Sequence, residues 1–398
     1  MGSRVIVVGA GPVGLALAGE LRVGGAEVTV LERLAAPTTE SRATTLDART
    51  MELLDERGLL APLGTVPREP RGHFGGLPLD LDSQPSPFAG QWKVPQARVE
   101  ALLGDRAREL GADIRREHEV HALHPAADGV AVDALVRGSG RRVRMTAGYV
   151  VGCDGEESTV AALAGFEFPG RDARRELLRC DVRGVDIPDR RFQRLPGGFA
   201  VAATREGLTR VMVHEYGRTP AVRTAAPGFD EVAEAWSRVT GEDISGGTPV
   251  WVNAFGDVSR QAAHYRRGRV LLAGDAAHRH LPVGGQAINL GLQDAFDLGW
   301  KLAAEVAGTA PAGLLDSYHE ERHRAGHRAM AIIDAQALIM LGGPEIEPVR
   351  SLFRELLGHR AVRELLASRL GGLDAGIRGL PGPAEPAGTP NRREEVPS

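Results

Sequence analysis

The glycine-rich turn GAGPVG at 9–14 constrains this chain more than any other feature. A β-branched run at 4–8 predicts a strand before it, the residues at 14–23 predict a helix after it, and 27–31 predict a second apolar strand. In such a βαβ unit the first glycine permits a tight turn, the second lets the backbone approach a diphosphate, and the third lets helix and strand pack closely. The turn therefore predicts a Rossmann-type domain whose dinucleotide ligand contacts Gly9, Gly11, Pro12, Val13 and Gly14.

An acidic residue follows the second predicted strand. Glu32 stands 18 residues beyond Gly14, where a carboxylate can bind ribose hydroxyls. The diphosphate would meet the N-terminus of the first helix, whose unpaired N–H groups carry roughly half a positive charge. The motif does not separate NAD from FAD, and a tight turn without a ligand is the structural alternative.

A second glycine-rich segment lies in the last third of the chain. The residues at 269–273 predict a buried strand that ends in Gly274-Asp275, and a loop at 282–289 leads into a helix. A carboxylate at a strand end can hold a ribityl hydroxyl, and a glycine-rich helix start can offer N–H groups to a flavin carbonyl. By spacing alone, a structural turn is the alternative.

Three motifs occur in a specific order: the N-terminal turn, GCDGEES at 152–158, and Gly274-Asp275 with its following loop. On these motifs the sequence resembles the FAD-dependent aromatic hydroxylases of the para-hydroxybenzoate hydroxylase type. Within that family it is most similar to the hydroxylases of bacterial aromatic polyketide biosynthesis, which make angucyclines and anthracyclines. The resemblance covers nearly the whole chain up to about residue 375.

The resemblance implies bound FAD, with NADPH or NADH as reductant and no separate domain for the latter. Asp275 would bind the ribityl chain, the backbone at Ile288 and Asn289 would bind the pyrimidine edge, and Pro282 would lie near the oxygen-reactive carbon of the flavin. Asp154 would take part in both FAD and NAD(P)H binding. Together with the glycine turn, the implied cofactor residues are Glu32, Arg33, Arg42, Gln96, Asp154, Asp275, Pro282, Gly284, Gly285, Ala287, Ile288 and Asn289.

The sequence departs from the family pattern in three places. Ala161 stands where an arginine is usual, and Ala287 stands where the flavin loop usually has glycine. The thioredoxin-like C-terminal domain of the family is expected to be missing. The first departure concerns the NAD(P)H contact and the second adds a methyl group beside the flavin.

The predicted fold class is α/β, or α+β overall: a Rossmann-type FAD-binding domain with an inserted mixed β-sheet substrate domain and C-terminal helices. The FAD-binding domain is expected at 1–70, 96–178 and 262–372, the substrate domain at 71–95 and 179–261, and a flexible tail at 373–398. Segments at 113–120, 130–136 and 141–146 alternate in polarity and predict an antiparallel meander.

A large flat substrate needs an apolar pocket between the domains. Aromatic and thioether side chains in the predicted substrate domain are candidates for it, although each is also a common core residue. They are Phe74, Trp92, Met212, Trp251 and Phe255.

The implied reaction is hydroxylation of an aromatic polyketide in antibiotic biosynthesis: NAD(P)H reduces FAD, and O2 forms a flavin hydroperoxide that passes one oxygen to a phenolic ring. No catalytic side chain is predicted beyond Pro282 near the flavin, since the cofactor supplies the hard chemistry. A Baeyer–Villiger or epoxidising monooxygenase would share every motif. Two alternatives come from other classes. An NAD-dependent dehydrogenase is disfavoured by Gly274-Asp275 and its loop, and a non-catalytic flavin-binding partner protein is suggested by Ala161 and Ala287.

Charge and composition bear on partners and location. The chain has 48 basic and 52 acidic residues, so a small molecule is favoured over nucleic acid or a membrane surface. Two cysteines and the lack of an apparent secretion signal predict a location in a reducing cytoplasm. The chain is expected to be a monomer or a homodimer. No metal is predicted: His278 and His280 have no evident cysteine or aspartate partner nearby, and the histidines at 319–327 are expected to form a solvated surface stripe.

Overall fold

A parallel sheet forms the first part of the molecule in the computed structural model, which describes residues 4–37, 45–223 and 225–374. Its strand order is β19-β20-β11-β1-β2-β7. All neighbours are parallel except β19, which is antiparallel to β20. The bounds are β1 (Arg4–Val8), β2 (Glu27–Leu31), β7 (Asp113–Arg115), β11 (Tyr149–Gly152), β19 (Arg266–Arg267) and β20 (Val270–Leu272).

Apart from Arg4 and Glu27 at their starts and Thr29, the central strands β1 and β2 are apolar, because both faces of the sheet are covered. Helix α1 (Pro12–Val23) packs between α4 (Gln96–Glu109) and α7 (Gln286–Ala307). An antiparallel meander joins the same core: β8 (His118–Pro125), β9 (Val130–Val136) and β10 (Arg141–Ala147). The short helices α2 (Ala48–Asp55), α3 (Leu60–Leu63) and α5 (Thr159–Leu163) complete this part. The predicted fold class is confirmed.

One predicted strand is wrong. The segment 113–120 is two strands in two sheets, since β7 pairs with β2 and β8 begins the meander. The chain turns at Glu117, which has a left-handed φ of 60°. Glutamate gives no sequence signal for such a turn, which is usually marked by glycine or asparagine.

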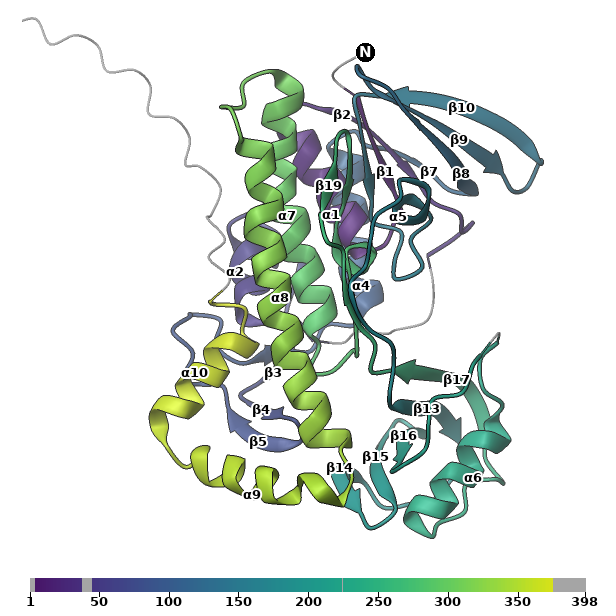
Figure 1. Ribbon diagram of the computed structural model, residues 1–398, viewed down its shortest axis with the longest axis vertical. Helices are drawn as coiled ribbons and strands as arrows, with labels where there is room; N and C mark the ends of the chain where they lie inside the picture. Colours follow the sequence, from purple (N-terminus) through teal and green to yellow (C-terminus); the bar gives the residue numbers. More distant parts are fainter. Residues whose placement is uncertain (1–3, 38–44, 224, 375–398) are drawn as a thin grey trace, which may run out of the picture.

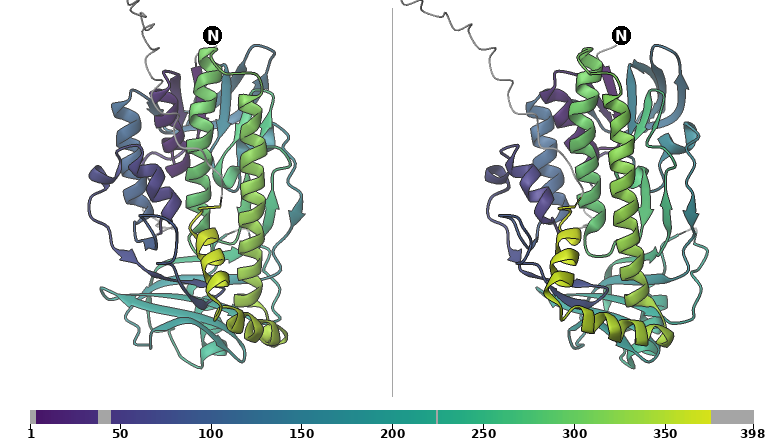
Figure 2. Two further views of the ribbon diagram at one scale, coloured as in Figure 1. Left: turned by 90° about the vertical axis from the view of Figure 1, so that its left-hand side faces the viewer. Right: turned by 60° about the vertical axis from the view of Figure 1, so that its left-hand side comes forward.

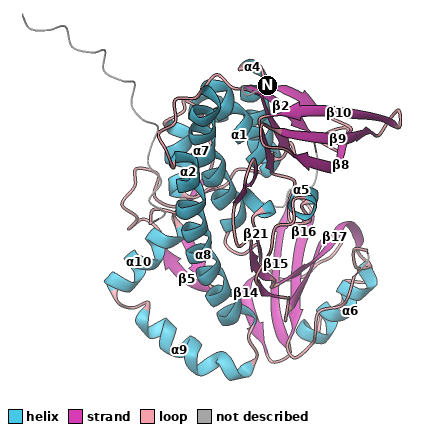
Figure 3. Cartoon of the chain, turned by 45° about the horizontal axis from the view of Figure 1, so that its top comes forward, coloured by secondary structure: helices cyan, strands magenta, loops and turns pink. Residues whose placement is uncertain are grey.

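A five-stranded antiparallel sheet forms the second part, in the order β14-β15-β16-β13-β17. Alternate residues face opposite sides: Cys180, Val211 and Ala200 pack against Trp236 of helix α6, while the other face looks toward α8 (Figure 3). The bounds are β13 (Glu176–Arg183), β14 (Arg190–Leu195), β15 (Gly198–Arg205), β16 (Leu208–Glu215), β17 (Thr248–Gly256), α6 (Phe229–Thr240) and α8 (Leu314–Leu341).

Helix α8 runs the length of the molecule and lies beside α7 in the upper part, and its lower end reaches the five-stranded sheet (Figures 1 and 2). The remaining elements cluster where the parts meet or at the foot of α8. They are β3 (Arg68–Glu69), β4 (Arg71–Phe74), β5 (Leu77–Asp80), β6 (Gln91–Trp92), β12 (Gly170–Arg171), β18 (Ser259–Gln261), β21 (His278–His280), α9 (Glu347–Leu356) and α10 (Arg360–Leu370). Among the described residues, no single helix is both long and apolar enough to cross a membrane.

Candidate functional site

The glycine turn after β1 has the geometry that each glycine was expected to serve. Gly9 has φ of 103°, and a Cβ on it would lie 2.3 Å from the Cys153 carbonyl oxygen. A Cβ on Gly14 would lie 2.0 Å from the Gly9 carbonyl oxygen. A Cβ on Gly11 would meet nothing within 4 Å, so the space beside Gly11 is open to a ligand. The turn therefore closes tightly on both sides and stays open at its middle, where helix α1 begins without a side-chain cap.

The carboxyl ends of the parallel strands β20, β11, β1 and β2 meet beside this turn, which is the edge where ligands bind in open α/β sheets. Glu32 follows β2, and its carboxylate accepts hydrogen bonds from the Ala10 N–H at 2.7 Å and the Leu34 N–H at 2.8 Å. These bonds fix the carboxylate beside the glycine turn. Arg33 is exposed, and Arg42 lies outside the described residues.

The Gly274-Asp275 turn follows β20 at the same edge and is held from beneath by Asp294 of α7. The buried Asp294 carboxylate accepts hydrogen bonds from the Gly274 N–H at 3.0 Å, His278 Nε2 at 2.8 Å and Arg322 Nε at 2.7 Å. Burial opposes ionisation of Asp294, but Arg322 and His278 lower its pKa overall. Asp275 is exposed and accepts no hydrogen bond within the described part of the chain, so its carboxylate is available to a ligand.

The loop before α7 presents backbone N–H groups. Gly284 and Gly285 have φ of 66° and 75°, and α7 begins at Gln286 without a side-chain cap. The N–H groups of Ala287 and Ile288 have no acceptor among the described residues. The first turn of α7 thus offers donors and the positive end of its dipole. Pro282, in the same loop, is exposed.

The Asn289 side chain ties this loop to residues 45–47. Its Oδ1 accepts from the Asp47 N–H at 3.0 Å, while its Nδ2 donates to the Thr45 carbonyl at 3.1 Å and to the Gly285 carbonyl at 2.8 Å. The side chain is therefore used in holding the loop, and a flavin contact at Asn289 would be made by its backbone.

Asp154 is committed to local structure. Its carboxylate accepts from Ser158 Oγ at 2.5 Å and from the Val160 N–H at 3.0 Å, which fixes the start of α5 behind the glycine turn. Ala161 is buried in the core, so its side chain does not face solvent. Gln96 is the first residue of α4 and has a bonding partner. A direct NAD(P)H contact by Asp154 stays a prediction.

Three predicted pocket residues lie on one face of the five-stranded sheet. Met212 and Phe255 pack against an apolar cluster that includes Leu281 and Val283 of the loop before α7. The Arg179 guanidinium lies over the Trp251 ring, with Arg179 Cζ 4.1 Å from the ring centroid. This face therefore meets the loop that follows Gly274-Asp275.

The other two predicted pocket residues lie elsewhere. Phe74 of β4 is 2% exposed and stacks on Phe353 of α9, with ring centroids 5.0 Å apart. Trp92 of β6 packs against the main core and donates from its indole nitrogen to the Phe88 carbonyl at 2.9 Å. Both side chains pack as core residues, which is the more common role of such side chains.

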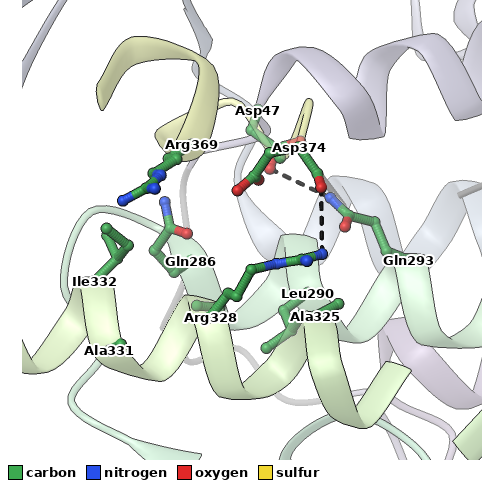
Figure 4. Close-up of a pocket in the computed structure, with 12 residues that line it drawn as sticks. Asp47, Gln286, Leu290, Gln293, Ala325, Arg328, Ala331, Ile332, Arg369 and Asp374 are labelled. Carbon is green, nitrogen blue, oxygen red and sulfur yellow. Dashed lines mark hydrogen bonds between the residues drawn. The ribbon is translucent and has the colours of Figure 1, made fainter. Parts of the chain in front are cut away.

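A cavity of about 150 Å³ lies between α7, α8 and the residues after α10 (Figure 4). Asp47 and Gln293 lie on one side of it, and Arg328 donates to the Asp374 carbonyl at 3.2 Å. Burial raises the pKa of Asp47 to about 7, and its hydrogen bonds to Thr50 oppose this. None of the cofactor residues predicted within the described ranges lines this cavity.

The open groups fit an extended dinucleotide. The bare Gly11 position and the uncapped start of α1 suit a diphosphate, the Asp275 carboxylate suits a sugar-chain hydroxyl, and the free N–H groups of α7 suit carbonyl oxygens of a flat ring. Sequence reasoning missed Asp294, His278 and Arg322, which carry no local signal because they meet only in the folded chain.

Comparison with known proteins agrees with this geometry. Residues 3–332 match the family model described as FAD binding domain. A 12-dehydrotetracycline 5-monooxygenase/anhydrotetracycline 6-monooxygenase of Streptomyces rimosus subsp. rimosus is 42% identical over 385 residues, which cover 93% of this chain and 76% of that protein. A dialkyldecalin synthase of Streptomyces rugosporus is 41% identical over 380 residues, which cover 94% of this chain and 81% of that protein.

A solved structure is similar over the same range. CabE, an aromatic hydroxylase from angucycline biosynthesis, matches with a TM-score of 0.90 and 49% identity, covering 94% of this chain and 76% of that chain.

Proposed function

Because the chain belongs to the FAD binding domain family and is a flavin-dependent monooxygenase, we propose that it hydroxylates an aromatic polyketide in antibiotic biosynthesis. The reductant is NADPH or NADH. One oxygen atom of O2 enters the ring. The other is reduced to water by the two electrons of the hydride that the nicotinamide gives up, with one further proton taken from solvent.

The observation that carries the proposal is the convergence of unused groups at one sheet edge. Gly11 leaves room for a diphosphate, while the Asp275 carboxylate and two N–H groups in the first turn of α7 have no hydrogen-bond partner among the described residues. The apolar face with Met212 and Phe255 meets the loop between the last two. A redox cofactor and an aromatic substrate can therefore be held side by side.

Bound FAD supplies the electron transfer and oxygen activation that no side chain provides. Gly11 and α1 would hold its diphosphate, with Glu32 and Arg42 near the adenosine and diphosphate groups. Asp275 would accept from the ribityl chain. The N–H groups in the first turn of α7 would bind the flavin carbonyl edge.

The apolar sheet face would orient the substrate ring and exclude water. Excluding water would keep the activated oxygen from being lost before it reaches the substrate. Pro282 is rigid and has no N–H, so it borders the reaction space without adding a polar group. Ala287 adds a methyl group at the same turn. This methyl group would affect the position of the flavin ring system.

The test is anaerobic reduction of the purified, FAD-loaded protein by NADPH, followed at the visible flavin band with and without a polycyclic phenolic polyketide. Faster bleaching with the polyketide, and a product one oxygen atom heavier on admission of air, support the proposal. A yellow protein that neither NADPH nor NADH bleaches contradicts it.

Product analysis separates the related outcomes. A ring hydroxyl supports hydroxylation, whereas an inserted ester oxygen or an epoxide of the same mass indicates Baeyer–Villiger oxygenation or epoxidation. One relative is named a dialkyldecalin synthase, so a product of unchanged mass would show that this chain acts without adding oxygen.

A further inference from the structure

Lysine is rare in this chain. Lys93 and Lys301 are its two lysines, although lysine and arginine together number 48. Lys301 lies between two carboxylates, with Nζ 2.9 Å from Asp297 and 2.9 Å from Glu321. Lys93 has no ion pair with any described residue. Within the described ranges its Nζ donates to two neutral oxygens, Gln91 Oε1 at 3.1 Å and Thr45 Oγ1 at 3.3 Å.

Lys93 lies beside the loop that would hold the flavin. Trp92 packs against the main core, and Lys93 as the next residue points to the opposite side. Thr45, which accepts the Lys93 hydrogen bond, packs against Gly285, where a Cβ would lie 3.0 Å from Thr45 Cβ. One side chain therefore separates the ammonium group from the loop before α7.

The five-stranded sheet contacts β4, the strand that carries His73. The His73 ring of β4 lies 4.0 Å from the Phe192 ring of β14, where the register shifts and Phe192 has φ of 53°. Arg191 and Arg205 of this sheet are exposed, and neither forms an ion pair among the described residues. Lys93 is near enough to His73 to lower the pKa of its ring, and Phe192 packs against the same apolar cluster as Met212 and Phe255. Lys93 is therefore placed between the loop before α7 and the substrate face.

The charges around Lys93 do not balance. Burial lowers the pKa of the Lys93 ammonium; Glu69 opposes this, while Arg191 and Arg205 lower it further. Burial, Arg191 and Lys93 lower the pKa of His73 to about 4, so His73 is neutral at pH 7. Lys93 and the charged groups that shift its pKa therefore comprise three cations and one carboxylate, in a place where bound ligand would exclude water.

We propose that Lys93 binds an ionised hydroxyl oxygen of the aromatic substrate, so that the substrate is taken up as a phenolate. The inference rests on the proposed function and specifies the chemical class of substrate: a polyketide with an acidic phenol. Ionisation releases the phenol proton to solvent and leaves the oxygen lone pair conjugated with the ring. The ring then becomes more electron-rich, which favours attack on an electrophilic oxygen.

A compact ammonium suits this role because it makes a point contact with one oxygen, whereas a guanidinium binds two oxygens in a fork. Arg191 and Arg205 add to the positive field. Glu69 reduces it, and the neutral His73 leaves it unchanged.

The scarcity of lysine makes a direct test feasible. Reductive methylation of the FAD-loaded protein with 13C-formaldehyde labels amines and keeps their charge, and Lys301 and the chain's first residue are assigned from K301R and from peptide mapping. The probe is 1,2-dihydroxyanthraquinone, whose phenolate absorbs at longer wavelength than its phenol. The expected result is that the probe shifts the Lys93 methyl signal and raises its pKa, and that NADPH shifts it far less.

Substitution gives an independent readout. The visible spectrum of bound probe reports its ionised fraction as pH is varied. K93M should raise the apparent pKa of the bound probe by about one unit or more, a tenfold loss of phenolate at neutral pH, and K93R should restore most of it. R142M removes an exposed charge of β10 that forms no ion pair with any residue the structure describes, and it should leave the pKa of the bound probe as in the parent protein.

The contrary results are distinct. An unmoved Lys93 signal with a bound, hydroxylated phenol overturns the inference and leaves the proposed function standing. If NADPH shifts the Lys93 methyl signal and the phenol does not, Lys93 binds the coenzyme, and the inference is also overturned. Failure of every phenol to bind the parent protein overturns the substrate class and the inference together.

Discussion

At the scale of single residues, a substitution of Gly11 should affect cofactor binding without affecting folding. Its Cβ position is empty and its φ is −77°, so G11A introduces a methyl group without backbone strain. The methyl group occupies the approach to the diphosphate. G11A should weaken FAD binding about tenfold or more and leave the melting temperature of the apoprotein unchanged, measured by FAD titration and thermal unfolding.

Gly14 provides the matched control. G14A places a Cβ 2.0 Å from the Gly9 carbonyl oxygen, so it should destabilise the apoprotein as well as weaken FAD binding. Equal FAD affinity for G11A and the parent protein would show that the diphosphate does not pass Gly11.

Asp294 is a positioning residue. It joins the Gly274 N–H, His278 and Arg322 in one buried cluster. Removing one partner of a buried ion pair leaves the other charge uncompensated, so D294A should lower the free energy of unfolding by about 3–5 kcal/mol, measured by urea denaturation of the apoprotein. Replacement of exposed Asp275 by alanine should cost under about 0.5 kcal/mol and weaken FAD binding instead. Similar stability losses for both would refute this division of roles.

The sequence predicted the glycine turns because their roles depend on neighbouring residues and on backbone conformation. It did not predict Lys93 or Asp294, because their contacts come from distant segments: Thr45 for Lys93, and Arg322 across two helices for Asp294. The imbalance between lysine and arginine was the one available signal for Lys93.

At the scale of elements, α2 is capped by a carboxyl group that titrates near neutrality. Asp47 accepts from the Thr50 N–H at 2.7 Å, and its pKa is about 7 in the folded chain against 3.8 in the unfolded one. The folded chain binds this proton more tightly, so the stability it contributes is present at low pH and lost as pH rises from about 4 to 7.

Asparagine caps helices as well as aspartate does but does not titrate. D47N should therefore become more stable relative to the parent protein as pH rises through that window, by up to about 1.4 kcal/mol per pH unit, measured by urea denaturation at several pH values. A pH-independent difference would show that Asp47 is ionised throughout.

The first helix and the buried strands β1, β2 and β20 were predicted within about two residues of their observed bounds, because apolar periodicity and glycine ends mark them. The division of 113–120 was not predicted, since β7 and β8 alternate in polarity equally and the turn at Glu117 depends on tertiary context. The sequence also does not show which face of the five-stranded sheet meets the cofactor part, because both faces carry apolar residues.

At the scale of the whole molecule, α8 joins the two parts. Ile333 and Ala337 of α8 are buried against Leu177 and Phe199 of the five-stranded sheet, while Arg322 reaches the cofactor part. The two parts should therefore unfold together. Single-tryptophan variants that keep only Trp236 in α6 or only Trp300 in α7 should give the same urea midpoint by fluorescence. Two separate midpoints would mean that the parts are independent.

The strand order β19-β20-β11-β1-β2-β7 also imposes a sequence of events on a growing chain. The five-stranded sheet uses one continuous stretch, 176–256, and can form as soon as that stretch is made. The parallel sheet must wait for β20, and the cofactor edge must wait for the start of α7 at Gln286. During synthesis the substrate face is therefore built before the place where FAD binds, and the apolar residues that later meet the loop before α7 remain uncovered until that loop arrives.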